Sequence, residues 1–139
     1  MTGREALRGR ALGVLLAAAV LSSCTSTAFE PSELGRAQRA TDAVPATVLE
    51  TAQVDAASTR FVASWGSSRV FVARSSQEDL GTCLVVVAED PQTSASSCSH
   101  PGGVLEMSVA GDRYLLGESA DAGRSEQWTE LTEGVYALS

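Results

Sequence analysis

From residue 60 onward, apolar and polar positions follow one another in the short runs that are typical of strands. The stretches 60–65 and 69–74 are separated by Gly66-Ser67-Ser68, and Val70 and Val72 of the second stretch fall on one side. Successive side chains of a strand point to opposite faces, so this order of strand, turn and strand predicts a hairpin.

Further strands are expected toward the C-terminus. The stretch 82–89 contains Leu84-Val85-Val86-Val87, a continuous apolar run that predicts a strand buried on both faces. Two more hairpins are predicted from the pairs of stretches 104–109 with 113–116 and 128–131 with 135–138. The polar stretch 90–103 is interpreted as a loop. The sequence thus predicts a mainly β domain with a small antiparallel sheet, a β-meander of about six strands.

The region before residue 60 has little to bury. Pro45 suits the first position of a short helix within 44–55, where Val48, Leu49 and Ala52 share a face. Residues 24–43 are rich in Ser, Thr, Ala and charge, which predicts a flexible tether with a reach of about 25 Å. The expected organisation is an N-terminal signal over 1–23, a tether over 24–43 and a small β domain over 44–139.

The first 23 residues have the order of a secretory signal peptide. Three arginines precede an apolar run from Ala11 to Leu21. As a helix this run would reach about 16 Å, against a hydrocarbon core of about 30 Å. The run is therefore too short for an ordinary transmembrane span.

Leu21-Ser22-Ser23-Cys24 follows this run and resembles the lipobox of bacterial lipoproteins. The resemblance implies that a diacylglyceryl lipid is attached to the Cys24 sulfur, with fatty acids such as palmitate, and that cleavage falls between Ser23 and Cys24. It implies a chain anchored by lipid to the outer, extracytoplasmic face of the cell membrane. The alternatives are a soluble secreted protein in which Cys24 is incidental, and an uncleaved membrane anchor.

Three cysteines are present, and an odd number in an exported chain needs an explanation. Lipid on Cys24 would leave Cys83 and Cys98, 15 positions apart, as a disulfide pair in an oxidising compartment. Closing a loop of that length would stabilise the fold by about 3 kcal/mol. The alternatives are two free thiols or a metal pair, although the spacing is far from that of zinc motifs.

The charge limits the classes of partner. The formal net charge is −7, and removing residues 1–23, which hold three Arg and one Glu, leaves −9. An acidic surface repels phosphate backbones and anionic lipid head groups. Nucleic-acid binding is therefore not expected, and contact with the membrane must come from the lipid.

No arrangement of residues predicts catalysis or metal binding. His100, the one histidine, lies in a Ser-rich stretch without the Gly-x-Ser-x-Gly setting of a nucleophile. The acidic pairs Glu78-Asp79 and Glu89-Asp90 flank predicted turns, where carboxylates are ordinarily solvated. Trp65 and Trp128 are interpreted as core residues rather than as an exposed ligand platform. No catalytic residue, no metal ligand and no cofactor other than the lipid on Cys24 is predicted.

A second resemblance covers residues 55–110. The segments 55–60, Thr82-Cys83-Leu84-Val85-Val86 and Gly102-Gly103-Val104 resemble those of small actinobacterial envelope proteins without an assigned activity. This resemblance implies a secreted, disulfide-bonded β domain and transfers no functional residue.

Together these features predict a membrane-anchored envelope lipoprotein whose folded part is a non-catalytic binding module for an envelope protein or cell-wall partner. The alternative is a small extracytoplasmic hydrolase or metal-dependent enzyme. That alternative requires a pocket in which His100 meets at least two of the carboxylates named above.

Overall fold

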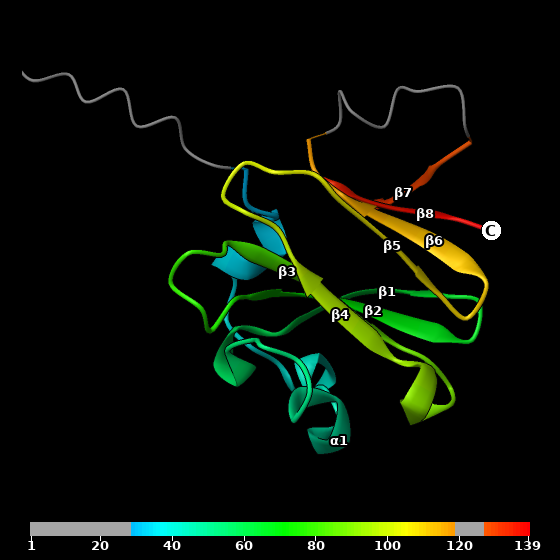
Figure 1. The fold of residues 1–139 in the computed structure, drawn as a ribbon, viewed down its shortest axis with the longest axis horizontal. Coiled ribbons are helices and arrows are strands. Elements are labelled where there is room, and N and C mark those ends of the chain that lie inside the picture. Colours follow the sequence, from blue (N-terminus) through cyan, green and yellow to red (C-terminus); the bar gives the residue numbers. More distant parts are fainter. Residues whose placement is uncertain (1–28, 119–126) are drawn as a thin grey trace, which may run out of the picture.

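The computed structural model describes residues 29–118 and 127–139, and this part of the chain forms two four-stranded antiparallel sheets (Figure 1). The first sheet has the order β1-β2-β3-β4, with bounds Arg60–Trp65, Ser68–Arg74, Thr82–Val87 and Ala95–Cys98. The second has the order β5-β6-β8-β7, with bounds Leu105–Val109, Asp112–Leu116, Val135–Leu138 and Thr129–Thr132. The predicted mainly β, antiparallel fold is confirmed.

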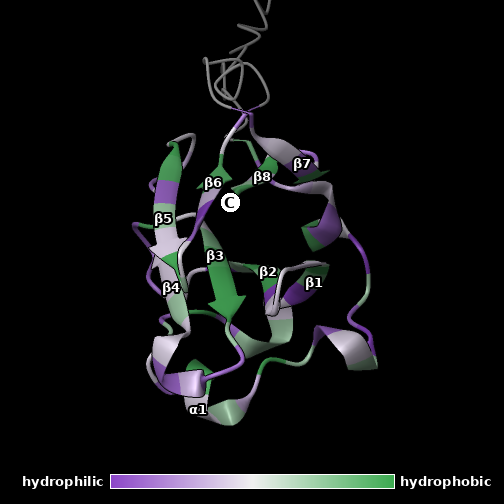
Figure 2. Ribbon diagram, turned by 90° about the vertical axis from the view of Figure 1, so that its right-hand side faces the viewer, coloured by the Kyte–Doolittle hydropathy of each residue, from purple (hydrophilic) through white to green (hydrophobic). Residues whose placement is uncertain are grey.

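The main core lies between the two sheets. Alternate residues of each strand point inward, because the side-chain period of a strand is two. Val70 and Val72 of β2 belong to one buried cluster with residues of the second sheet, among them Tyr114, Leu116 and Val135. Figure 2 shows the apolar strands of the two sheets facing one another. Burial of these side chains is the main force that holds the sheets together.

A second apolar layer covers the opposite face of the first sheet. Phe71 and Val85 point to this face, where Val44 and Val48 pack against them. Val48 belongs to α1, Ala46–Leu49, which lies below the first sheet in Figure 1. All six residues of β3 are consequently buried, as the apolar run predicted.

The N-terminal helix is shorter than the predicted range 44–55. α1 is a single turn that begins directly after Pro45. Val54 then makes an isolated antiparallel bridge to Ser75, which requires extended backbone. Four 3₁₀ turns complete the helical structure of the described part: η1 Ser32–Gly35, η2 Ala40–Asp42, η3 Ala56–Ser58 and η4 Pro91–Thr93.

The prediction of a flexible tether over 24–43 is wrong for residues 29–43. Leu34 is 3% exposed and belongs to the core between the sheets, and Asp42 is fully buried. Three packed side chains, Phe29, Pro31 and Leu34, and the ion pair of Arg36 with the buried Asp42 hold a segment that its Ser- and Ala-rich composition had assigned to the tether. Residues 24–28 lie outside the described part.

The prediction of a loop over 90–103 is wrong in its middle. β4 lies there and pairs with β3, so that the described part has eight strands in two sheets instead of one meander of about six. Polar side chains hid this strand, since Ser96 and Ser97 give it no apolar alternation. Backbone pairing with the fully buried β3 holds this segment as a strand even though it lacks an apolar pattern.

Gly134 provides the space in which the ring of Phe29 packs. Its φ is +79°, and the ring of Phe29 packs where a Cβ atom would stand. The same Cβ would lie 2.7 Å from the carbonyl oxygen of Gly117. Only glycine combines the left-handed conformation with this close approach. Phe29 is thereby held over the turn between β7 and β8.

Candidate functional site

The disulfide predicted between Cys83 and Cys98 is present. The two residues lie directly opposite each other on β3 and β4, with Cα atoms 3.9 Å apart. Cys83 is fully buried, whereas Cys98 is partly exposed. The bond therefore ties an outer strand of the first sheet to its most buried strand. Cys24 and Ser23, the predicted lipidation and cleavage residues, lie outside the described part.

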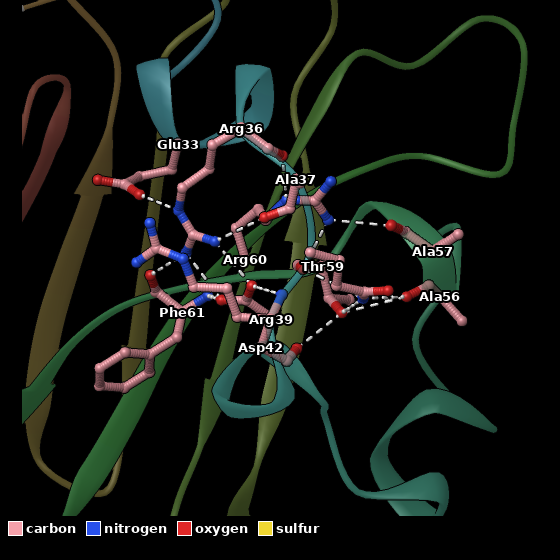
Figure 3. Close-up of polar contacts among 11 residues, drawn as sticks. Glu33, Arg36, Ala37, Arg39, Asp42, Ala56, Ala57, Thr59, Arg60 and Phe61 are labelled. Carbon is pink, nitrogen blue, oxygen red and sulfur yellow. Dashed lines mark hydrogen bonds and ion pairs between the residues drawn. The ribbon is translucent and has the colours of Figure 1, made fainter.

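A polar cluster surrounds Asp42, and the sequence had not indicated it (Figure 3). The Arg36 guanidinium donates two hydrogen bonds to the carboxylate, from Nη1 to Oδ2 at 2.7 Å and from Nη2 to Oδ1 at 2.8 Å. The backbone N–H of Arg39 donates to Oδ2 at 2.6 Å, and that of Phe61 donates to Oδ1 at 2.7 Å. Four donors therefore surround one buried carboxylate.

Further hydrogen bonds to backbone carbonyl oxygens hold the residues around this carboxylate in place. The hydroxyl of Thr59 donates to the carbonyl oxygen of Asp42 at 2.9 Å. Nε of Arg60 donates to the carbonyl oxygen of Arg36 at 2.9 Å, and its Nη1 donates to the carbonyl of Ala57 at the same distance. These bonds join the segment 36–42 to the beginning of β1, as Figure 3 shows.

The electrostatics favour the ionised pair. The Arg36 guanidinium holds the pKa of the Asp42 carboxyl well below its usual range, burial acts in the opposite direction, and the N–H groups of Phe61 and Arg39 add to the lowering. Asp42, followed by Glu33, raises the pKa of Arg36 in turn. A carboxylate with all its lone pairs occupied and its charge compensated has no free oxygen for a substrate or metal. We interpret the cluster as structural.

The Asp42 cluster covers one edge of the first sheet. β1 is the edge strand, and the N–H of Phe61 would otherwise be an unpaired donor there. The strand also carries a bulge between Phe61 and Ala63. Covering and bulging are two devices that prevent an edge strand from pairing with another chain. Arg36 directly follows η1 and Asp42 ends η2, so the two residues belong to separate short turns, and no periodic sequence pattern could have indicated their contact.

The structure does not bring the predicted titratable residues together. His100 is exposed in the turn after β4, and Asp90 uses its carboxylate to accept a hydrogen bond from the N–H of Gln92 at the start of η4. Glu78 and Asp79 are exposed between β2 and β3. Within residues 29–118 and 127–139, no group of three His, Cys, Asp or Glu side chains could hold a metal ion.

A hollow with a volume of about 370 Å³ lies where Phe29 meets the loops around residues 78 and 101. The ion pair between Arg74 and Glu30, at 2.8 Å, lines it, and both side chains are about half exposed. Glu78 contributes to the lining, whereas His100 does not. A paired cation and a lone solvated carboxylate do not form an acid–base constellation.

The aromatic and arginine side chains have mainly packing roles. Trp65 packs against the core between the sheets, as predicted, and the half-buried Trp128 lies with its ring 5.3 Å from the Arg113 guanidinium carbon. Arg69 stacks over Phe71 at 5.3 Å. Both Arg69 and Arg74 belong to β2, an inner strand of its sheet.

Within the described part, no helix is both long enough and apolar enough to cross a membrane. Comparison with known proteins gave no match to a family model, to a curated protein or to a solved structure.

Proposed function

We propose that this protein is an exported envelope lipoprotein, held on the outer face of the cell membrane by lipid on Cys24, whose β domain is a non-catalytic binding module. The observation that carries the proposal is the sequence Leu21-Ser22-Ser23-Cys24 directly after a basic region and an apolar run. The disulfide supports it, because Cys83 and Cys98 pair with each other and leave Cys24 free for lipid. A disulfide also fits an oxidising compartment outside the cytosol.

Substituting Cys24→Ala is expected to abolish incorporation of a labelled fatty acid and to leave residues 1–23 attached, since only the thiol forms the thioether that precedes cleavage. Gel mobility and intact mass of the protein from labelled cells measure both effects. The matched control is the double variant Cys83→Ala/Cys98→Ala, which also loses cysteines and should keep the label. A Cys24→Ala protein that is still labelled would show that the lipid is elsewhere.

β4, the last strand of the first sheet, has no paired strand on its outer side among the described residues, and this unpaired edge supports a binding role. The N–H of Ser99 donates to the carbonyl oxygen of Thr82 at 2.9 Å. Because hydrogen-bonded and non-hydrogen-bonded pairs alternate in an antiparallel ladder, Ser96 and Cys98 then direct their backbone groups away from β3. These groups have no backbone hydrogen bond to any residue that the structure describes. An extended peptide of a partner protein could add a strand there.

A photo-crosslinking side chain placed at Ser96 is expected to join the protein to a partner in intact cells. Ser96 lines a hollow of about 280 Å³ beside β4 with Gln53 and Leu80, so an added strand would pass over it. The matched control is the same side chain at Thr41, next to the covered edge β1, where no product should form. Equal products from the two positions would contradict binding at β4, and a product with the mass of two copies would identify a second copy as the occupant.

An enzymatic function has no specific observation in its favour. The hydrolase alternative requires a pocket that unites His100 with several carboxylates, and the hollow beside Phe29 is lined by Glu78 but not by His100. The binding role is therefore the function that the geometry supports best.

A further inference from the structure

The strands of the sandwich run between two ends that differ in character. The first, here called the Phe29 end, is where the described chain begins. Phe29 packs there over Gly134, in the turn between β7 and β8, and lines a hollow together with Leu80 and Pro101. In Figure 1 this end lies to the left, with the loops that follow β2 and β4.

The opposite end, here called the tryptophan end, carries the turns between β1 and β2 and between β5 and β6. A Cβ on Gly66 in the first turn would lie 3.7 Å from the carboxylate of Asp112, which begins β6. Trp65 is the last residue of β1, and Trp128 stacks with Arg113, the neighbour of Asp112. Both tryptophans therefore mark the end that lies to the right in Figure 1.

The chain between the lipid and the fold is short compared with the sandwich. Five residue steps separate Cys24 from Phe29, and even a fully extended chain covers at most about 18 Å in five steps. The seven residues of β2 span about 23 Å between the two ends. A chain fixed at the Phe29 end therefore cannot reach around the domain to place the tryptophan end against the membrane.

We infer that the Phe29 end faces the lipid head groups of the anchoring membrane and that the tryptophan end points away from it. This orientation rests on the proposed lipid on Cys24. It follows from the folding of residues 29–43 onto the domain, because a free segment of that length would have allowed any orientation.

The short connection to the lipid holds the Phe29 end near the head-group layer, and its negative charge opposes insertion. Exposed carboxylates surround this end, and one of them, Glu30, pairs with Arg74. The acidic residues are Glu30, Glu78, Asp79, Glu118 and Glu133. They repel anionic head groups over a screening length of about 8 Å, which is within the reach of the five-residue connection. The Phe29 end therefore faces the membrane surface, at a distance that the five-residue connection and the charge repulsion determine.

Fluorescence quenching tests the orientation. The lipidated mature protein is bound to vesicles that contain a lipid with a nitroxide on its head group. In a Trp65→Phe/Trp128→Phe background, one tryptophan is introduced as Ser76→Trp at the Phe29 end or, as the matched control, as Ser67→Trp in the turn between β1 and β2. Both serines are exposed in turns. Quenching of Ser76→Trp is expected to exceed that of Ser67→Trp by about twofold or more, since the connection keeps the first site close to the membrane.

The outcomes separate the orientation from the anchor. Equal quenching of the two variants on vesicle-bound protein, or stronger quenching of Ser67→Trp, would overturn the orientation and leave the anchor intact. Protein that does not float with vesicles would overturn the proposed lipid itself. Inserting about 20 Gly and Ser residues before Phe29 should remove the difference between the variants, because that length adds a reach of about 25 Å. A difference that persists would show that a short tether is not its cause.

Discussion

The Asp42→Ala variant is expected to lose about 3–5 kcal/mol of unfolding free energy. The substitution removes the buried carboxylate that Arg36 binds through both Nη atoms, and it leaves the Arg39 and Phe61 N–H groups without their acceptor. The ion pair that remains to Arg36 is the more exposed one with Glu33, and each buried donor left without an acceptor costs about 1–3 kcal/mol. Since small domains are stable by only about 5–15 kcal/mol, equilibrium denaturation should show the loss as a large shift in midpoint.

Glu33→Gln is the matched control for that variant. Glu33 also pairs with Arg36, at 2.9 Å, but both side chains are about one-quarter exposed. Solvent-exposed pairs contribute about 0–1 kcal/mol, so this variant should unfold close to the wild-type midpoint. If both variants lost the same small amount, the buried carboxylate would not be what holds residues 36–42 on β1.

The same pair predicts how stability depends on pH. The folded-state pKa of Asp42 lies below its unfolded value of about 3.9. The contribution of Asp42 is therefore complete above that unfolded value, and it declines as the pH falls from there toward the folded-state pKa. The Asp42→Ala variant should accordingly lose less stability on acidification than the wild type does.

The strands that could be predicted from the sequence are those with a recognisable pattern of apolar side chains. β3 could be found because Leu84-Val85-Val86-Val87 is apolar at every position, which is required when both faces of a strand are covered. β4 could not, because its position depends on backbone pairing with β3 and on the bond to Cys83. Backbone pairing leaves no pattern of side chains in the sequence. A polar strand that is held mainly by pairing with its neighbour therefore has the composition of a loop.

The division of the strands into two sheets could not be predicted from local sequence patterns either. The pattern gave the hairpins of β5 with β6 and of β7 with β8, but β8 lies between β6 and β7 in the sheet. Each hairpin is specified by neighbouring residues, whereas the order of hairpins is set by which faces pack together in the core.

The candidate sites divide in the same way. Cysteine counting was sufficient for Cys83 and Cys98, because oxidation in an exported chain needs only a partner within reach. The contact of Arg36 with Asp42 needed the fold, because it forms only when residues 29–43 lie along β1. This contact also changes the expected anchor, since it makes most of the predicted tether part of the domain and leaves five residue steps to the proposed lipidation site, Cys24.

Removing the disulfide by Cys83→Ala/Cys98→Ala is expected to lower the free energy of unfolding by about 3 kcal/mol, the loop-closure entropy of a 15-residue loop. For a domain of this size, that loss corresponds to a fall in Tm of about 12–24 °C. The loss should exceed the entropic figure if β4 also frays, because β4 pairs only with β3 in its sheet and has no apolar alternation of its own. Calorimetry of the oxidised protein and the double variant measures the effect.

Ser96→Ala/Ser97→Ala is the control, since it changes the same strand and keeps the bond. It should shift Tm by only a few degrees, as substitutions away from core and caps usually cost under about 0.5 kcal/mol each. Amide exchange adds a spatial readout. In the cysteine variant, protection should fall first along β4 and at Ser99, whose N–H donates to the carbonyl oxygen of Thr82, whereas β6 and β8 in the other sheet should keep theirs. Uniform loss of protection in both sheets would mean that the bond stabilises the sandwich as a whole, and that β4 is not a separately opening edge.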